Sequence, residues 1–354
     1  MRNGRLLIDM HTHLARYEKQ SESTRQWFIS LYPSEADYRA VCDANATPEA
    51  FCALLEEKGV DYAVVLAEDT PAVTGVADNR LVADFCKRHP RLLPFCTFDP
   101  LKEKNMPDQL RQLAAEGFRG VKLYPTYNFF YPNDPMLYPL YEAAQELGLP
   151  VMFHTGLSVF KGSRLKYGDP IFYDDIAVDF PDLKIVMCHG GRDCWYKEAV
   201  TVARLHENVY IDVAGLPPKK LLTYFPDLPR LAHKFVFGTD WPSVDIGKNA
   251  DDLAALPLSE ETVGASSARL PRACWGCDPP QNTFLKSGLP YEQIFSASFG
   301  LLHPLGAAAG VLEAARRREL RLCAGAAHRV FLCVLPGRAS YKKERQGGGR
   351  HPAG

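Results

Sequence analysis

The 354-residue sequence lacks an uninterrupted apolar stretch of about 18 residues, so we expect no membrane-spanning helix and no membrane partner. Its opening residues, MRNGRLLIDMHTHL, lack the apolar region of a secretory signal peptide. The ten cysteines are scattered, which favours free thiols in a reducing compartment over a disulfide framework. Together these absences predict a cytoplasmic protein.

The net charge of the chain is only -1, but basic and acidic residues are unevenly distributed along it. From Gly264 onward there are 13 Lys and Arg against 5 Asp and Glu, which leaves 28 basic and 37 acidic residues before that point. We therefore divide the chain into residues 1–262 and an atypical extension, residues 263–354, which we expect to be partly disordered because it has little periodicity.

The extension carries two weak motifs. Cys274 and Cys277 form a single C-x-x-C without a second pair, so we do not expect a zinc site there. A cluster of three arginines at 316–318 has no interleaved aromatic residues, so we expect no nucleic-acid binding. A non-catalytic binding protein that acts through this basic tail nevertheless stays open as an alternative function.

Eight short apolar runs, rich in β-branched residues, predict strands that are buried on both faces. Amphipathic segments with helix signals, such as TPEAFCALLEEKGV, alternate with them. This alternation predicts a (β/α)8 barrel rather than a doubly wound sheet, because no glycine-rich phosphate loop follows the first strands. The predicted strands are residues 6–13, 61–68, 91–99, 118–125, 149–156, 183–191, 209–215 and 234–242. Residues 14–46 form a long insertion after the first strand, for which a lid and a plain surface loop are both open.

Several predicted strands end on residues that bind metals. The first ends on His11 and His13, which share one face because a strand has a period of two. Later strands end on His154, His189 and Asp240. Because all strands of a parallel barrel end at the same face, we expect these five side chains to converge. Imidazole nitrogens and carboxylate oxygens are typical ligands of a catalytic zinc ion.

These motifs, with the flanking text GFRGVKLYP, LPVMFHTG, DLKIVMCHGG and FGTDWP, resemble the amidohydrolase superfamily, and in particular its amidohydrolase-2 branch. That branch includes the aminocarboxymuconate-semialdehyde decarboxylase relatives. The resemblance covers about residues 5–262. It implies that His11, His13, His154 and Asp240 hold one divalent metal, usually zinc. Manganese and iron suit the same ligands.

The resemblance further implies that His189 is the catalytic histidine and that Asp240 accepts a proton from the water that the metal activates. It also leaves a homodimer open. Lys122 stands where binuclear relatives carry a carboxylated lysine and where TatD-type nucleases carry a glutamate, which argues against a nuclease. We interpret Lys122 and Arg164 as cations that face a substrate carboxylate. Carboxylation of Lys122, simple packing of its stem under the site, and a solvated loop around Arg164 are also open. Asp9 is a candidate partner of an imidazole or of the first loop.

The expected function is a metal-dependent hydrolase that activates water to attack a C–N or C–O acyl bond of a small molecule. The alternative on the same ligands is non-oxidative decarboxylation of a small aromatic or muconate-like acid. The sequence departs from the family after LPLSEET, where VGASSARLPRACWGC replaces the usual final helix.

Overall fold

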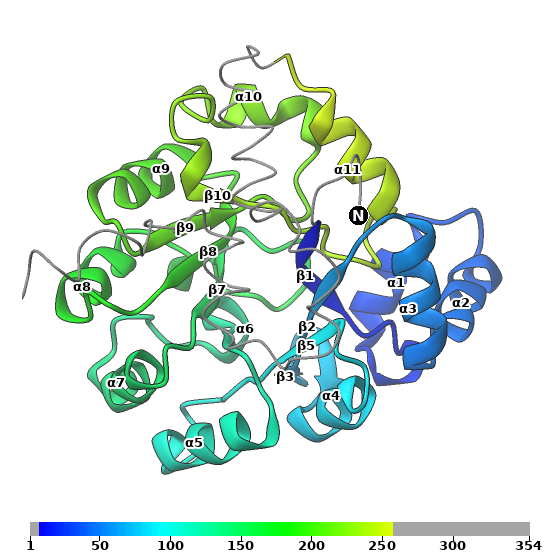
Figure 1. Ribbon diagram of the computed structural model, residues 1–354. Helices are drawn as coiled ribbons and strands as arrows, with labels where there is room; N and C mark the ends of the chain where they lie inside the picture. The colour runs from blue at the N-terminus through cyan, green and yellow to red at the C-terminus, as the bar shows by residue number, and fades with distance from the viewer. Residues whose placement is uncertain (1–6, 258–354) are drawn as a thin grey trace, which may run out of the picture. The chain divides into compact units, whose positions relative to one another are not determined.

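Eight parallel strands form the centre of residues 7–257, the part of the chain that the computed structural model describes (Figure 1). They make a three-stranded sheet in the order β1-β2-β5 and a five-stranded sheet in the order β10-β9-β8-β7-β6. Parallel bridges from Cys96 to Val121 and from Thr12 to Trp241 join the two sheets into a closed ring. This confirms the predicted (β/α)8 barrel. The strands are β1 (Ile8–His13), β2 (Tyr62–Leu66), β5 (Leu92–Phe95), β6 (Val121–Leu123), β7 (Val151–Gly156), β8 (Ile185–Arg192), β9 (Val209–Asp212) and β10 (Phe235–Val236).

Alternate residues of the strands form two cores. Ile8 and Met10 of β1 pack with Val186 and Cys188 of β8 in a cluster of residues that come from the strands. Residues between them, such as Met187, join a larger cluster that includes side chains of the helices. Because side chains alternate across a strand, the first cluster fills the barrel and the second lies between strands and helices.

Helices surround the strands, as Figure 1 shows. The predicted start of α3 is confirmed, because the Thr47 side chain accepts a hydrogen bond from the Ala50 amide and Pro48 occupies the first helical turn. Three helices of this layer, α6, α8 and α10, were not predicted. The helices of this layer are α3 (Pro48–Glu57), α4 (Asn79–Cys86), α5 (Met106–Glu116), α6 (Pro125–Asn128), α7 (Tyr138–Glu146), α8 (Phe172–Asp179), α9 (Tyr196–Leu205), α10 (Leu221–Tyr224) and α11 (Ile246–Ala254).

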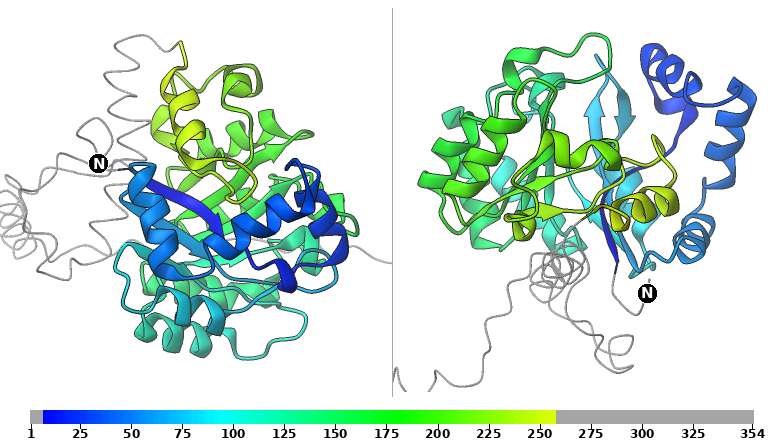
Figure 2. Two further views of the ribbon diagram at one scale, coloured as in Figure 1. Left: turned by 90° about the vertical axis from the view of Figure 1, so that its right-hand side faces the viewer. Right: turned by 90° about the horizontal axis from the view of Figure 1, so that it is seen from above.

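The insertion after β1 is folded and contains α1 (Glu22–Ile29) and α2 (Glu35–Ala44). It contacts a hairpin of two short antiparallel strands, β3 (Glu68–Thr70) and β4 (Gly75–Ala77). Gln20 bridges to Gly75, where a Cβ atom would lie 2.2 Å from the Lys19 carbonyl oxygen, so only glycine allows this close approach. Figure 2 shows these helices and the hairpin beyond the C-terminal end of β1.

The described residues test only some of the other predictions. The six cysteines within residues 7–257 are free thiols, as expected. No helix in that range combines the length and the hydrophobicity that a bilayer crossing needs. The extension, including Cys274, Cys277 and the arginines at 316–318, lies outside the described residues, and the boundary at residue 262 and the homodimer stay predictions.

Candidate functional site

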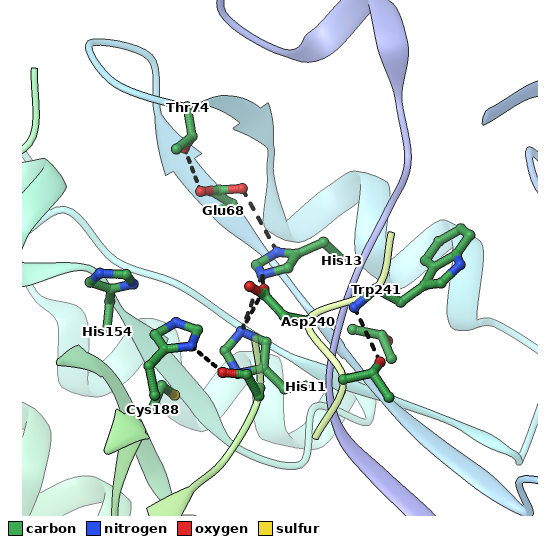
Figure 3. A network of polar contacts seen from close by, with 12 residues as sticks. His11, His13, Glu68, Thr74, His154, Cys188, Asp240 and Trp241 are labelled. Carbon is green, nitrogen blue, oxygen red and sulfur yellow. Dashed lines mark hydrogen bonds and ion pairs between the residues drawn. The ribbon is translucent and has the colours of Figure 1, made fainter. Parts of the chain in front are cut away.

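Three predicted ligands meet at the C-terminal end of the barrel (Figure 3). The Nε2 atoms of His11 and His13 are 3.2 Å apart. The Oδ1 atom of Asp240 lies 3.4 Å from the first and 3.3 Å from the second. Two imidazole nitrogens and a carboxylate oxygen at these separations can bind one divalent cation. Of the predicted set, the structure thus brings these three into one group.

The backbone where the barrel closes positions this group. The Asp240 amide donates to the His11 carbonyl at 2.8 Å, and the His13 amide donates to the Trp241 carbonyl at 2.9 Å. Asp240 has a φ of 66°, a left-handed conformation that is uncommon outside glycine. Burial would raise the pKa of its carboxyl, but hydrogen bonding to His13 and the electrostatic interaction with His11 lower the pKa to about 2. Asp240 is therefore an anion at neutral pH.

Asp212 at the end of β9 orients His11, and it was not among the predicted site residues. Its Oδ2 atom lies 2.5 Å from Nδ1 of His11. Burial raises the pKa of the Asp212 carboxyl to about 7 and keeps the pKa of His11 well below its ordinary value. With the carboxylate accepting the Nδ1 proton, the lone pair on Nε2 of His11 faces Asp240 and His13. Atoms with lone pairs that face one another suit a cation between them.

His154 and His189 line the same cavity but lie outside the group of three. Nδ1 of His154 is 3.3 Å from the Tyr127 hydroxyl, whereas its Nε2 is buried without a hydrogen-bond partner. Because a buried polar atom without a partner is costly, this nitrogen fits a further metal ligand. The His189 ring centroid is 5.0 Å from that of His11 and 4.8 Å from that of His154.

The tautomer of His189 follows from its backbone contact. Its Nδ1 lies 2.8 Å from the carbonyl oxygen of Ala214. A carbonyl can only accept, so Nδ1 carries the proton and Nε2 keeps its lone pair. Burial, reinforced by the charge of Arg192, holds the pKa of His189 well below its ordinary value. His189 is therefore a neutral proton acceptor in the cavity.

Four cationic side chains line this cavity: Arg16, Lys19, Lys122 and Arg192. Of these, Lys122 was predicted as a site residue and Arg192 was not. Lys122 is fully buried, with Nζ 2.9 Å from the sulfur of Cys188. Arg192, at the end of β8, has a buried Nε without a hydrogen-bond partner. Arg164, in contrast, is exposed and its guanidinium lies over the Phe129 ring, 4.6 Å from the centroid, so it is not one of the lining residues.

Asp9 secures the backbone rather than an imidazole. Its Oδ1 accepts from the amides of His11 at 3.1 Å and Thr239 at 3.0 Å, and its Oδ2 accepts from the Thr239 hydroxyl at 2.6 Å. These bonds join β1 to the segment that precedes Asp240. The sequence left two roles open for Asp9, as partner of an imidazole or of the first loop, and these contacts match neither.

Aromatic side chains form much of the cavity wall above the metal-binding group. They come from the insertion, from α6 with the residue before it and from the loop after β7: Trp27, Phe28, Tyr124, Tyr127 and Phe160. Glu68 of the β3–β4 hairpin also lines the cavity and faces His13. The insertion therefore forms part of the wall.

Comparison with known proteins places the chain in a family. The model of the family described as amidohydrolase, Amidohydro_2, matches residues 8–276. An uncharacterised TIM-barrel protein from Bordetella bronchiseptica is similar in structure, with a TM-score of 0.59 and 22% identity over 75% of this chain and 97% of that one.

Two decarboxylases are also similar in fold. The dihydroxybenzoic acid decarboxylase of Polaromonas sp. JS666, with bound manganese and the inhibitor 2-nitroresorcinol, has a TM-score of 0.54 and 17% identity over 80% of this chain and 99% of that one. The 5-carboxyvanillate decarboxylase of Novosphingobium aromaticivorans, complexed with manganese and 4-hydroxy-3-methoxy-5-nitrobenzoic acid, has a TM-score of 0.55 and 16% identity over 74% and 93% of the two chains.

Proposed function

Because the chain belongs to the amidohydrolase family Amidohydro_2, we propose that it is a metal-dependent enzyme that removes carbon dioxide from a small aromatic carboxylate. One observation supports an aromatic carboxylate as the substrate. The cavity above the metal-binding group combines aromatic walls with the cations Lys122 and Arg192. A planar ring packs well between aromatic side chains, and a guanidinium pairs with a carboxylate. Family membership favours an enzyme over the alternative of a non-catalytic binding protein.

His11, His13, His154 and Asp240 would hold the metal. The first two and Asp240 have ligand atoms within 4.8 Å of one another, and the Nε2 atom of His154 is buried without a partner. A divalent cation bound there would supply Lewis acidity towards an oxygen of the substrate. Zinc and manganese both suit these ligands, and manganese is the ion in the two decarboxylases of similar fold.

Decarboxylation breaks the bond between the ring carbon and the carboxylate carbon. The electron pair stays on the ring carbon, carbon dioxide leaves, and a proton takes its place. Asp240 is anionic and His189 is neutral, so each starts as a proton acceptor. Asp240 would therefore collect a proton from solvent and deliver it to the ring carbon, while Arg192 orients the carboxylate.

Hydrolysis of a C–N or C–O acyl bond is the second candidate. It is compatible with the ionised state of Asp240, because a carboxylate in this metal-binding group can take the proton of an attacking water. The bond from the acyl carbon to nitrogen or oxygen would break, and the proton would pass to the leaving group. His189 would stabilise the oxyanion through a hydrogen bond once its Nε2 is protonated.

Isotope labelling separates the two reactions. The manganese-loaded protein is incubated with hydroxybenzoates and, separately, with amides and lactones of similar size, in D2O and in H2(18)O. Decarboxylation should release CO2 and place one deuterium on the ring carbon that lost it. Incorporation of 18O into a new carboxylate without CO2 release would favour hydrolysis. Absence of both reactions would overturn the proposed function, and turnover that is unchanged in Asp240→Asn would overturn the proposed site.

A further inference from the structure

The imidazoles of His11, His13 and His154 differ in what their Nδ1 atoms contact. Nδ1 of His11 faces the Asp212 carboxylate at 2.5 Å, and Nδ1 of His154 faces the Tyr127 hydroxyl at 3.3 Å. Nδ1 of His13 is buried and has no hydrogen-bond partner. The atom opposite it is Oε2 of Glu68, at 3.8 Å. Glu68 and Asp240 thus lie on opposite sides of the His13 ring (Figure 3).

We propose that Glu68 is a positioning residue that orients His13 towards the metal, an inference that rests on the metal site proposed above. A small rotation of the His13 ring would close the 3.8 Å gap to a hydrogen bond from Nδ1 to Glu68. The Nε2 lone pair would then face Asp240, as it does in His11. Carboxylate partners of this kind fix the tautomer and raise the basicity of the ligand nitrogen.

The hairpin holds the Glu68 carboxylate in place. Its Oε1 atom accepts hydrogen bonds from the hydroxyls of Thr70, at 3.3 Å, and Thr74. Both threonines are buried, so they fix the carboxylate without exposing it to water. Glu68 itself is only 18% exposed and turns its second oxygen to His13.

The same hairpin is joined to the insertion after β1. The Ser21 amide donates to the Thr74 carbonyl at 2.8 Å, and the Ser21 hydroxyl donates to the Val73 carbonyl at 2.6 Å. Two separate segments thus determine where Glu68 lies. A carboxylate whose place is fixed in this way can orient an imidazole without the entropy loss that a mobile side chain would suffer.

Metal affinity tests this role. The dissociation constant for Mn2+ is measured by competition with a chelator for the wild type, Glu68→Gln, Thr74→Val and the control Glu18→Gln. Glu18 is exposed and pairs with Arg39, away from the cavity. We expect a loss of about 10- to 100-fold for Glu68→Gln. The loss should be smaller for Thr74→Val, and the control should match the wild type.

Two further measurements exclude a merely structural role. The melting temperature of the metal-free protein should be the same in Glu68→Gln and Glu18→Gln. Glu68→Gln should also add nothing to the loss in His13→Ala, because the glutamate acts through that imidazole. Unchanged affinity in both Glu68→Gln and Thr74→Val would overturn the inference. A wild type that binds neither Mn2+ nor Zn2+ would instead overturn the proposed metal site.

Discussion

Nδ1 of His11 and a carboxylate oxygen of Asp212 lie 2.5 Å apart, although 201 positions separate the two residues in the sequence. Both side chains are almost completely buried. The contact fixes which nitrogen of His11 carries the proton, and therefore which one can bind a cation. Metal affinity should therefore depend on this contact.

Replacing Asp212 by asparagine should weaken Mn2+ or Zn2+ binding by about 10- to 100-fold, because the shape is kept while the charge that polarises His11 is lost. Equilibrium dialysis with elemental analysis measures the effect. Asp227→Asn is the matched control, since Asp227 is 51% exposed and pairs with Arg230. Equal affinities in the two variants would contradict this role of Asp212.

Gly238→Ala should disrupt the site sterically. A Cβ atom at Gly238 would lie 2.6 Å from Oδ1 of Asp212 and 2.7 Å from Cβ of His11, so both residues must move. The expected result is loss of stoichiometric metal and a melting temperature lower by several degrees. At Gly247 in α11 the nearest atom is the flexible Lys58 side chain, at 3.0 Å, so Gly247→Ala should keep the metal. Full metal content in Gly238→Ala would show that the site tolerates the added Cβ atom.

Protonation of Asp9 should make the free energy of unfolding depend on pH. Burial, opposed by hydrogen bonds to Thr239 and His11, raises the pKa of its carboxyl from 3.8 to about 7. Between pH 3.8 and about 7, Asp9 holds a proton in the folded protein but has released it in the unfolded chain. The contribution of Asp9 to the free energy of unfolding therefore falls as pH rises through this window and stays low above it.

Asp9→Asn cannot titrate and isolates this effect. In urea unfolding of the metal-free protein, the stability of the variant relative to the wild type should rise from pH 4 to about pH 7 and then level off. A difference that is constant over this range would show that Asp9 does not keep its proton in the folded state.

Arg192 and Arg164 should differ in their effect on ligand binding. Arg192 lines the cavity, whereas Arg164 is exposed and lies over Phe129. Arg192→Gln should weaken binding of a hydroxybenzoate to the manganese-loaded protein by at least tenfold, because a charge-assisted pair with the carboxylate is lost. Arg164→Gln should change it less than twofold. Titration calorimetry measures both affinities. A larger loss in Arg164→Gln than in Arg192→Gln would favour Arg164 as the residue that faces the carboxylate.

The sequence predicted the barrel well because its strands are apolar throughout and its helices carry end signals. Each predicted run overlaps a strand, although β10 has only two residues, Phe235 and Val236. The run 234–242 looked longer because residues beyond Val236 are also buried and apolar. The backbone there turns away into the positive φ of Asp240, which hydrophobicity does not reveal. The hairpin β3–β4 was missed because its strands have three residues each.

The site was predictable where a strand end identified it. His11, His13 and Asp240 met as expected, and Asp212 ends β9 in the same way, so the same rule could have found it. Arg192 follows His189 closely in β8 but was overlooked in favour of the basic loop around Arg164. Glu68 ends the predicted strand 61–68, so the same rule applied to it, but its contact with His13 depends on the hairpin, which was not predicted.

The closure of the barrel has a consequence for how the protein matures. The metal-binding group joins His11 near one end of the described chain to Asp240 near the other, across the bridge from Thr12 to Trp241. While the chain is being synthesised, the group therefore stays incomplete until residue 240 has left the ribosome. An ion that binds all three residues can therefore enter only after the last strand of the barrel has been synthesised.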